Sequence, residues 1–296
     1  MKTVAVIGAG TIGLSWTTLL LAEGHRVRVS DPRPDLDTAV REAIAQFAPA
    51  VPGFTGTAEE LLDRVEIVPD LVPAITGADV VQENGPENLE FKQDLFARIE
   101  QAAPAEALLL TSTSGLLPSD IGRSMAEPGR VIVGHPFNPP HVLPLVELVP
   151  SERTAPQLLQ RAEEFYRSLG KVPVTVHKEI RGFVANRLQK ALFTECVNLV
   201  RQGVVDEAEL DEIVTNSVGI RWAAIGPFQA FHLGGGPGGL RHMLAHLMSD
   251  IDPDTADFLA TQAEELFGLD RYAELTDQRD RRQLAIISST TDTEGR

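Results

Sequence analysis

This 296-residue sequence contains one cysteine and no long apolar run, and its 26 Lys and Arg residues are outnumbered by 42 Asp and Glu residues. The single cysteine, Cys196, excludes an internal disulfide and a cysteine metal cluster, and its apolar helical surroundings (ALFTECVNLV) predict a buried, inert thiol. No apolar run has the length of a membrane span and a strand begins close to Met1, so we expect a cytoplasmic protein without a membrane partner. The net charge of −16 disfavours nucleic acid as a partner.

The first thirty residues have the order of a dinucleotide-binding unit. A β-branched strand over residues 3–7 runs into a G-x-G-x-x-G turn, which is followed by an apolar helix and by a second strand over 26–30. The first glycine permits a tight turn, the second lets the backbone approach a pyrophosphate, and the third lets the helix pack on the strand. Free N–H groups at the start of the helix favour phosphates. The expected cofactor contacts are Gly8, Gly10, Thr11, Ile12 and Gly13.

Asp31 ends the second strand, eighteen residues after Gly13. A carboxylate at this place accepts hydrogen bonds from both ribose hydroxyls of an adenosine and repels a 2′-phosphate. NAD is therefore the expected cofactor, in preference to NADP.

Strands alternate with helical segments as far as about residue 180. Strands are expected over residues 65–68, 78–82, 107–111, 130–134, 143–149 and 172–176, and helices over residues 35–47, 87–99 and 156–169. After Gly182, helices alone are expected, over residues 183–201, 207–218, 240–248 and 255–267, with a frayed tail over 289–296. The pattern predicts an α/β fold with a Rossmann-type, doubly wound, mostly parallel sheet in residues 1–180 and an all-α C-terminal domain in residues 181–296.

Four polar side chains outside the glycine turn are candidates for chemistry. Ser114 directly follows a buried strand, His135 and Glu147 each end a strand or an extended run, and Asn186 lies near the start of the second domain. A histidine can take a hydroxyl proton as hydride leaves the carbon, a carboxylate can orient it, and Ser and Asn can hydrogen-bond the substrate oxygen. Turn caps, a helix cap and a buried structural histidine are the alternatives that the spacing leaves open.

Several short motifs together resemble the L-3-hydroxyacyl-CoA dehydrogenase superfamily, from Val4 to about Leu247. The matching segments are the glycine turn, PENL at 86–89 with Lys92, STS at 112–114, HPFNP at 135–139, LVE at 145–147, and GF and NR at 182–183 and 186–187. This resemblance implies a dehydrogenase with the same two-domain fold, assembled as a homodimer through the helical domain.

The resemblance also implies roles for individual residues. His135 is the expected general base with Glu147 as its partner, and Ser114 and Asn186 are the expected contacts of the substrate oxygen. Glu87 and Lys92 are expected beside the nicotinamide half of the cofactor. The alternatives for these two are a carboxylate at a helix start and a solvent-exposed lysine.

Some segments distinguish the branches of the superfamily. The runs HPFNPP, LVELVP and SGLLPS resemble the L-gulonate 3-dehydrogenase and lambda-crystallin branch, whereas GIRWA at 219–223 and HLGGGPGGLRH at 232–242 are more similar to carnitine dehydrogenases. Arg221, expected in a loop between helices, is a candidate anchor for a substrate carboxylate, with a structural salt bridge as the alternative.

One departure from the family concerns coenzyme A. Fatty-acid members hold it with a basic helical hairpin after the second strand, whereas residues 35–63 here contain six acids and one base, Arg41. Because an acidic surface repels the phosphates of coenzyme A, a smaller free acid or another carrier is the expected substrate handle.

These observations predict an NAD-dependent enzyme that interconverts a 3-hydroxy and a 3-keto group on a small acid or acyl substrate. Carnitine 3-dehydrogenase, 3-hydroxyacyl-CoA dehydrogenase and polyketide 3-ketoreductase are alternative activities, and a crystallin-like or nucleotide-sensing protein is the non-catalytic alternative. No metal is expected, because His242 and His246 have the spacing of a zinc pair without an evident third ligand.

Overall fold

The computed structural model describes residues 1–248 and 251–291. The chain forms two compact units, Met1–Ala191 and the residues from Leu192 onward. The expected division at residues 180 and 181 lies just before helix α8 (Ala185–Arg201), which begins in the first unit and ends in the second.

The first unit is built on an eight-stranded sheet with the order β3-β2-β1-β4-β5-β6-β7-β8. All neighbouring strands are parallel except β6 and β7, which are antiparallel. The strands are β1 (Thr3–Ile7), β2 (Arg26–Ser30), β3 (Val65–Ile67), β4 (Val80–Glu83), β5 (Leu108–Thr111), β6 (Val131–Pro136), β7 (Leu145–Val149) and β8 (Val172–Thr175). The doubly wound, mostly parallel sheet expected from the sequence is confirmed.

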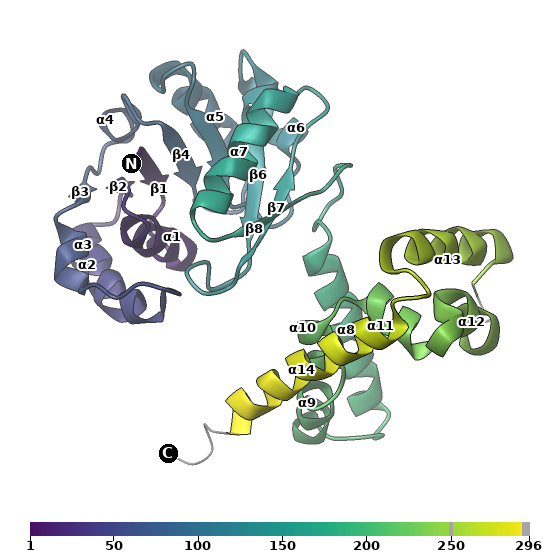
Figure 1. Ribbon diagram of the computed structural model, residues 1–296. Coiled ribbons are helices and arrows are strands. Elements are labelled where there is room, and N and C mark those ends of the chain that lie inside the picture. Colours follow the sequence, from purple (N-terminus) through teal and green to yellow (C-terminus); the bar gives the residue numbers. More distant parts are fainter. Residues whose placement is uncertain (249–250, 292–296) are drawn as a thin grey trace. The chain divides into compact units, whose positions relative to one another are not determined.

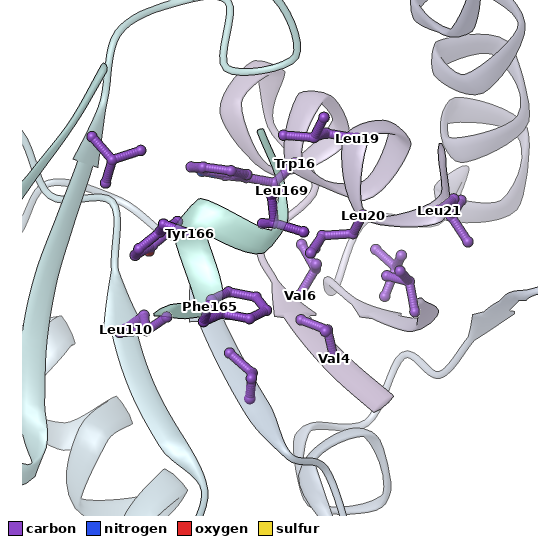
Figure 2. Close-up of a cluster of buried hydrophobic side chains, with 14 of the residues drawn as sticks. Val4, Val6, Trp16, Leu19, Leu20, Leu21, Leu110, Phe165, Tyr166 and Leu169 are labelled. Carbon is purple, nitrogen blue, oxygen red and sulfur yellow. The ribbon is translucent and has the colours of Figure 1, made fainter. Parts of the chain in front are cut away.

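Helices cover both faces of this sheet (Figure 1). They are α1 (Thr11–Ala22), α2 (Leu36–Phe47), α3 (Ala58–Leu62), α4 (Leu71–Ile75), α5 (Leu89–Ala102), α6 (Pro118–Ile121) and α7 (Pro156–Ser168). Successive side chains of a strand point to opposite faces, so Val4 and Val6 pack in the cluster under α1, α2 and α7, whereas Ala5 and Ile7 pack with α4, α5 and α6. Figure 2 shows side chains of α1 and α7 gathered over β1 and β5.

A buried polar chain runs through the first of these clusters. The Tyr166 hydroxyl donates to Gln82 Oε1 at 2.8 Å, and Gln82 Nε2 and Trp16 Nε1 donate to Ser112 Oγ at 3.0 and 3.1 Å. Ser112 Oγ in turn donates to Asn84 Oδ1 at 2.8 Å. Burial raises the pKa of Tyr166, so its hydroxyl stays a donor. The chain of hydrogen bonds thereby links α7 and α1 to the carboxyl ends of β4 and β5.

The second unit consists of helices in its described part. After α8 these are α9 (Glu207–Thr215), α10 (Val218–Ala224), α11 (Pro227–Gly234), α12 (Gly239–Leu247), α13 (Pro253–Phe267) and α14 (Tyr272–Thr291). The sequence pattern did not indicate α10, α11 or α14. The first three residues of the expected tail, 289–291, belong to α14, and residues 292–296 lie outside the described residues. None of the described helices is long and apolar enough to cross a membrane.

Two expectations for this part of the chain were wrong. Arg221 lies within α10 and not in a loop, because a seven-residue helix forms between Ser217 and Ile225. Cys196 is half-buried and not fully buried, because it lies on α8, which contains no fully buried side chain.

The Tyr166 hydrogen bond should be measurable in the stability of the fold. The Tyr166→Phe variant leaves Gln82 Oε1 buried without its donor, so we expect the free energy of unfolding, measured in urea, to fall by about 1–3 kcal/mol. The control is Tyr272→Phe, at a half-buried ring of the second unit, where a change within about 0.5 kcal/mol is expected. Equal losses in the two variants would contradict this role of the hydrogen bond.

Candidate functional site

The glycine turn between β1 and α1 has the geometry of a phosphate cradle. Gly8 has a φ of +95°, and a Cβ there would lie 2.8 Å from the Asn84 backbone. A Cβ at Gly13 would lie 1.9 Å from the Gly8 carbonyl oxygen, so both positions require glycine. A Cβ at Gly10 would meet nothing within 4 Å, so the backbone is open at the start of α1, where N–H groups are free for a pyrophosphate.

Asp31 lies beside this turn at the end of β2. Its carboxylate accepts the Ala9 N–H at 2.7 Å and the Arg33 N–H at 2.9 Å. A cavity of about 570 Å³ adjoins it, with Gly8, Pro32 and Leu71 among the lining residues. The carboxylate and the partly apolar walls fit the ribose and adenine of a dinucleotide.

His135 and Glu147 form a buried pair across the antiparallel strands β6 and β7. The strand register places them directly opposite each other, so their side chains share one face. His135 Nδ1 lies 2.8 Å from Glu147 Oε2, and the two side chains are 6% and 3% exposed. Because a carboxylate faces Nδ1, that nitrogen carries the proton of the neutral imidazole, and the lone pair of Nε2 is available as a hydrogen-bond acceptor.

Glu147 is also bound by the start of helix α8. Its Oε1 accepts the N–H groups of Val184 and Ala185, both at 2.9 Å. Burial acts to raise the pKa of Glu147, but the hydrogen bonds from His135, Ala185 and Val184 outweigh burial and hold this pKa below its usual value. The residue is therefore a carboxylate at neutral pH, and it fixes both the imidazole and the first turn of α8.

Asn186 and Ser114 lie on the open side of the imidazole. Asn186 Nδ2 donates to the Ser114 carbonyl oxygen at 3.2 Å and lies 3.4 Å from His135 Nε2. The rings of Phe137 and Phe183 have centroids 5.6 and 5.3 Å from that of His135. The imidazole is thus held by a carboxylate on one side, by aromatic rings beside it and by an amide at Nε2.

Glu87 shapes the turn that carries Ser114. Its Oε1 accepts the Thr113 hydroxyl at 2.6 Å and the N–H groups of Ser114 and Gly115 at 3.0 Å each. The Ser114 hydroxyl lies 3.3 Å from the same oxygen, which is a long and weak hydrogen bond. This hydroxyl can therefore turn toward a ligand without disturbing the turn.

The four side chains expected to carry chemistry meet at one cavity. Ser114, His135 and Asn186 line a space of about 510 Å³, and Glu147 supports His135 from behind. Ile12 and Glu87 line it as well, so the glycine turn adjoins this cavity. The sequence reasoning missed Ser112, Pro136, Phe137, Asn138 and Gln189 in this lining. The signal for Pro136, Phe137 and Asn138 was adjacency to His135 in the HPFN run. For Ser112 it was the STS run that contains Ser114, and for Gln189 a helical spacing of three from Asn186.

Lys92 lies inside the protein, next to Glu83. Its side chain is 1% exposed, so the alternative of a solvent-exposed lysine is wrong. Nζ donates to both carboxylate oxygens of Glu83 at 2.7 and 2.8 Å and to the Gly85 carbonyl oxygen at 3.3 Å. Glu83 also accepts the Thr111 hydroxyl at 2.5 Å and the Gly85 N–H at 2.6 Å. The pair thus supports the turn after β4 from inside the protein.

Two family models together match most of the chain. The NAD-binding domain of 3-hydroxyacyl-CoA dehydrogenase matches residues 3–180, and the C-terminal domain of 3-hydroxyacyl-CoA dehydrogenase matches residues 182–267.

Individual proteins are similar over comparable lengths. An L-carnitine dehydrogenase of Streptomyces griseus is 38% identical over 302 residues, which covers 98% of this chain and 90% of the relative. A 3-hydroxyacyl-CoA dehydrogenase of Gibberella moniliformis is 41% identical over 239 residues, covering 80% of this chain and 74% of the relative. The solved structure of 5-formyl-3-hydroxy-2-methylpyridine 4-carboxylic acid 5-dehydrogenase, an NAD+-dependent dismutase, matches with a TM-score of 0.73 at 28% identity, covering 100% of this chain and 99% of that one.

Removing one member of the buried Lys92–Glu83 pair should destabilise the fold strongly. The Lys92→Met variant leaves a buried carboxylate unpaired. We expect its free energy of unfolding, measured in urea, to be about 3–5 kcal/mol lower than that of the wild type. The double variant Glu83→Gln/Lys92→Met contains no uncompensated charge and should recover at least about half of that loss. A loss below about 1 kcal/mol for Lys92→Met would place this lysine in solvent.

Asp31 should control the choice between NAD and NADP. The Asp31→Asn variant keeps an acceptor for the Ala9 N–H and removes the negative charge, so the ratio of kcat/KM for NADP over NAD should rise about tenfold. The control is Asp35→Asn, a nearby exposed carboxylate paired with Arg33, for which a change within about twofold is expected. Equal ratios in wild type and Asp31→Asn would contradict the placement of the ribose.

Proposed function

We propose that this chain, which belongs to the 3-hydroxyacyl-CoA dehydrogenase family, oxidises the 3-hydroxyl group of a small free acid, with L-carnitine as the first candidate. The chain is an NAD-dependent oxidoreductase that acts on a CH–OH group. The observation that carries the proposal is the buried His135–Glu147 pair next to the glycine turn, in which His135 lines the cavity and its Nε2 is an acceptor beside the Asn186 amide.

The proposed reaction uses His135 as the base. His135 Nε2 takes the proton of the substrate hydroxyl while Glu147 accepts the Nδ1–H and stabilises the imidazolium that forms. The Ser114 hydroxyl and the Asn186 amide hydrogen-bond the substrate oxygen as it becomes a carbonyl oxygen. NAD, when bound, supplies the acceptor for the hydride that leaves the carbon. In the reverse direction the imidazolium returns its proton to the oxygen.

The cofactor is proposed to extend from the cavity beside Asp31, past the glycine turn, into the cavity beside His135. Gly8, Gly10, Thr11, Ile12 and Gly13 would hold the pyrophosphate. Asp31 would bind the adenosine ribose. The nicotinamide would lie near Glu87, which lines the cavity of His135, and Lys92 would act through Glu83 and the Gly85 turn.

Charge supports a free acid over a coenzyme A thioester. The six acids of residues 35–63 are all exposed in the segment that contains α2 and α3. This surface repels the phosphates of coenzyme A, and the net charge of −16 attracts a cationic group such as a trimethylammonium. We propose Arg221 on α10 as the anchor of the substrate carboxylate.

One observation favours a second candidate. A relative that is 41% identical carries the name 3-hydroxyacyl-CoA dehydrogenase, so a small thioester is the alternative substrate.

The roles of the two parts of the chain are also part of the proposal. Residues 1–180 would bind NAD, and residues 181–296 would bind substrate and form a homodimer in the cytoplasm. The match of separate family models to residues 3–180 and 182–267 supports this division.

The Glu147→Gln variant tests the acid-base pair. Its amide nitrogen would donate to His135 Nδ1 and force the proton to Nε2, which can then no longer accept the hydroxyl proton. We expect kcat for oxidation of L-carnitine by NAD to fall about 10²- to 10⁴-fold. The dissociation constant of NADH should stay within about twofold. The control Glu152→Gln changes an exposed glutamate just beyond β7 and should leave kcat within about twofold.

Substrate choice is read from the same wild-type assay. L-carnitine, L-gulonate, 3-hydroxybutyrate, its coenzyme A thioester and a reduced aromatic β-keto ester are compared. Higher kcat/KM on the thioester would overturn the argument from the acidic segment, and unchanged turnover in Glu147→Gln would overturn the role of the pair.

A further inference from the structure

The loop over residues 137–144 forms part of the wall of the reaction cavity. It connects β6 to β7 and carries Phe137 and Asn138, which line the cavity beside His135. Its sequence FNPPHVLP contains three prolines, which have no N–H to donate. Within the loop, the N–H groups of Val142 and Leu143 bond to the Pro139 carbonyl oxygen at 3.0 Å. Other contacts that hold the loop come from elsewhere in the first unit.

The first external contact is a reciprocal pair of hydrogen bonds with α1. The His141 N–H donates to Ser15 Oγ at 2.9 Å, and Ser15 Oγ lies 2.8 Å from His141 Nδ1. Because the hydroxyl already accepts the N–H, its own proton is free to be donated to Nδ1 of a neutral imidazole. Burial, followed by the charge of Lys171, lowers the pKa of His141 and favours this neutral form. Ser15 is fully buried and His141 is 5% exposed.

The second contact is a buried lysine at the start of β8. Lys171 Nζ donates to the carbonyl oxygens of Pro140 and Leu143, the latter at 3.0 Å. Its ammonium also lies 5.8 Å from the centre of the Trp16 ring. Burial lowers the pKa of Lys171 to about 8, with a smaller opposing effect of Glu23. An amine donates hydrogen bonds in either protonation state, so these contacts with the loop persist across neutral pH.

The third contact is aromatic. The Phe47 ring at the end of α2 stacks on the His141 ring with centroids 4.5 Å apart and an interplanar angle of 18°. The imidazole is thus fixed by a hydrogen bond at Nδ1 and by an aromatic ring on one face. Ser15 belongs to the same helix as Ile12, which lines the reaction cavity next to the glycine turn.

We propose that Ser15, His141 and Lys171 are positioning residues that latch the loop of residues 137–144 to the dinucleotide-binding helix and so set Phe137 and Asn138 in the wall of the reaction cavity. The catalytic half of this inference rests on the proposed function. The latch acts on the substrate side, because the glycine turn is fixed by its own bonds from Gly8 to Ser30 and from Ala9 to Asp31.

The test compares two replacements of His141 that differ in one acceptor. In His141→Asn the amide oxygen stands where Nδ1 stood and keeps the acceptor for Ser15, whereas His141→Leu removes it. Ser15→Ala removes the hydroxyl that bonds to His141. Lys171→Met removes the ammonium that bonds to the carbonyl oxygens of Pro140 and Leu143. The control is Thr18→Val, an isosteric change on the same helix that removes a bond to the Leu14 carbonyl oxygen and does not touch the loop.

Hydrogen–deuterium exchange of the peptide containing residues 137–143 is the first readout, and it requires no substrate. Exchange at the N–H groups of His141, Val142 and Leu143 should speed up roughly three- to tenfold in His141→Leu, Ser15→Ala and Lys171→Met. His141→Asn and Thr18→Val should exchange like the wild type. Unchanged exchange in His141→Leu and Ser15→Ala, or equal acceleration in His141→Asn and His141→Leu, would overturn the latch.

Steady-state kinetics are the second readout. The variants His141→Leu, Ser15→Ala and Lys171→Met should have a kcat/KM for the substrate about tenfold below that of the wild type. Their dissociation constant for NADH should stay within about twofold. Faster loop exchange with unchanged kcat/KM would overturn the positioning role. A wild type that oxidises none of the candidate substrates would contradict the proposed function instead, and the exchange data would still decide whether the latch exists.

Discussion

The site depends on one carboxylate, Glu147, and on the two structural elements that it joins. It lies opposite His135 because β6 and β7 pair antiparallel in a register that aligns these two residues. Its second oxygen accepts the first N–H groups of α8 and thereby places Asn186 next to the imidazole. A buried carboxylate with three hydrogen bonds stays ionised, so the same group orients the histidine and anchors the helix that completes the cavity.

Two further carboxylates, the buried Glu83 and the exposed Glu87, organise the neighbouring turns. Glu83 accepts hydrogen bonds from Lys92, the Thr111 hydroxyl and the Gly85 N–H beneath the turn after β4. Glu87 accepts hydrogen bonds from the Thr113 hydroxyl and from the N–H groups of Ser114 and Gly115 in the turn after β5. Each carboxylate fixes the backbone at the carboxyl edge of the sheet, where ligands bind in doubly wound folds. The exposed acids of α2 and α3 have a different consequence, since they give this part of the surface a negative charge.

Features set by contiguous residues could be predicted from the sequence, whereas contacts and burial that depend on tertiary packing could not. The strand, glycine turn, helix and terminal Asp31 are contiguous, so the dinucleotide unit was readable without a structure, and NAD as cofactor is confirmed by the family match. Spacing could not show that His135 and Glu147 meet, because their distance depends on β7 running antiparallel within a mostly parallel sheet. The burial of Lys92 was equally hidden, because its partner Glu83 lies on a strand nine residues away. Arg221 was misplaced because the weak pattern of the short helix α10 resembles a loop.

The most direct test of this account is the tautomer of His135, read from its ring ¹⁵N chemical shifts at neutral pH and assigned with a His135→Gln variant. If Glu147 orients the imidazole, Nδ1 carries the proton and Nε2 has the shift of an unprotonated nitrogen, and Glu147→Gln exchanges the two. A proton on Nε2 in the wild type would contradict the account, because that nitrogen could not then accept the proton of a substrate hydroxyl.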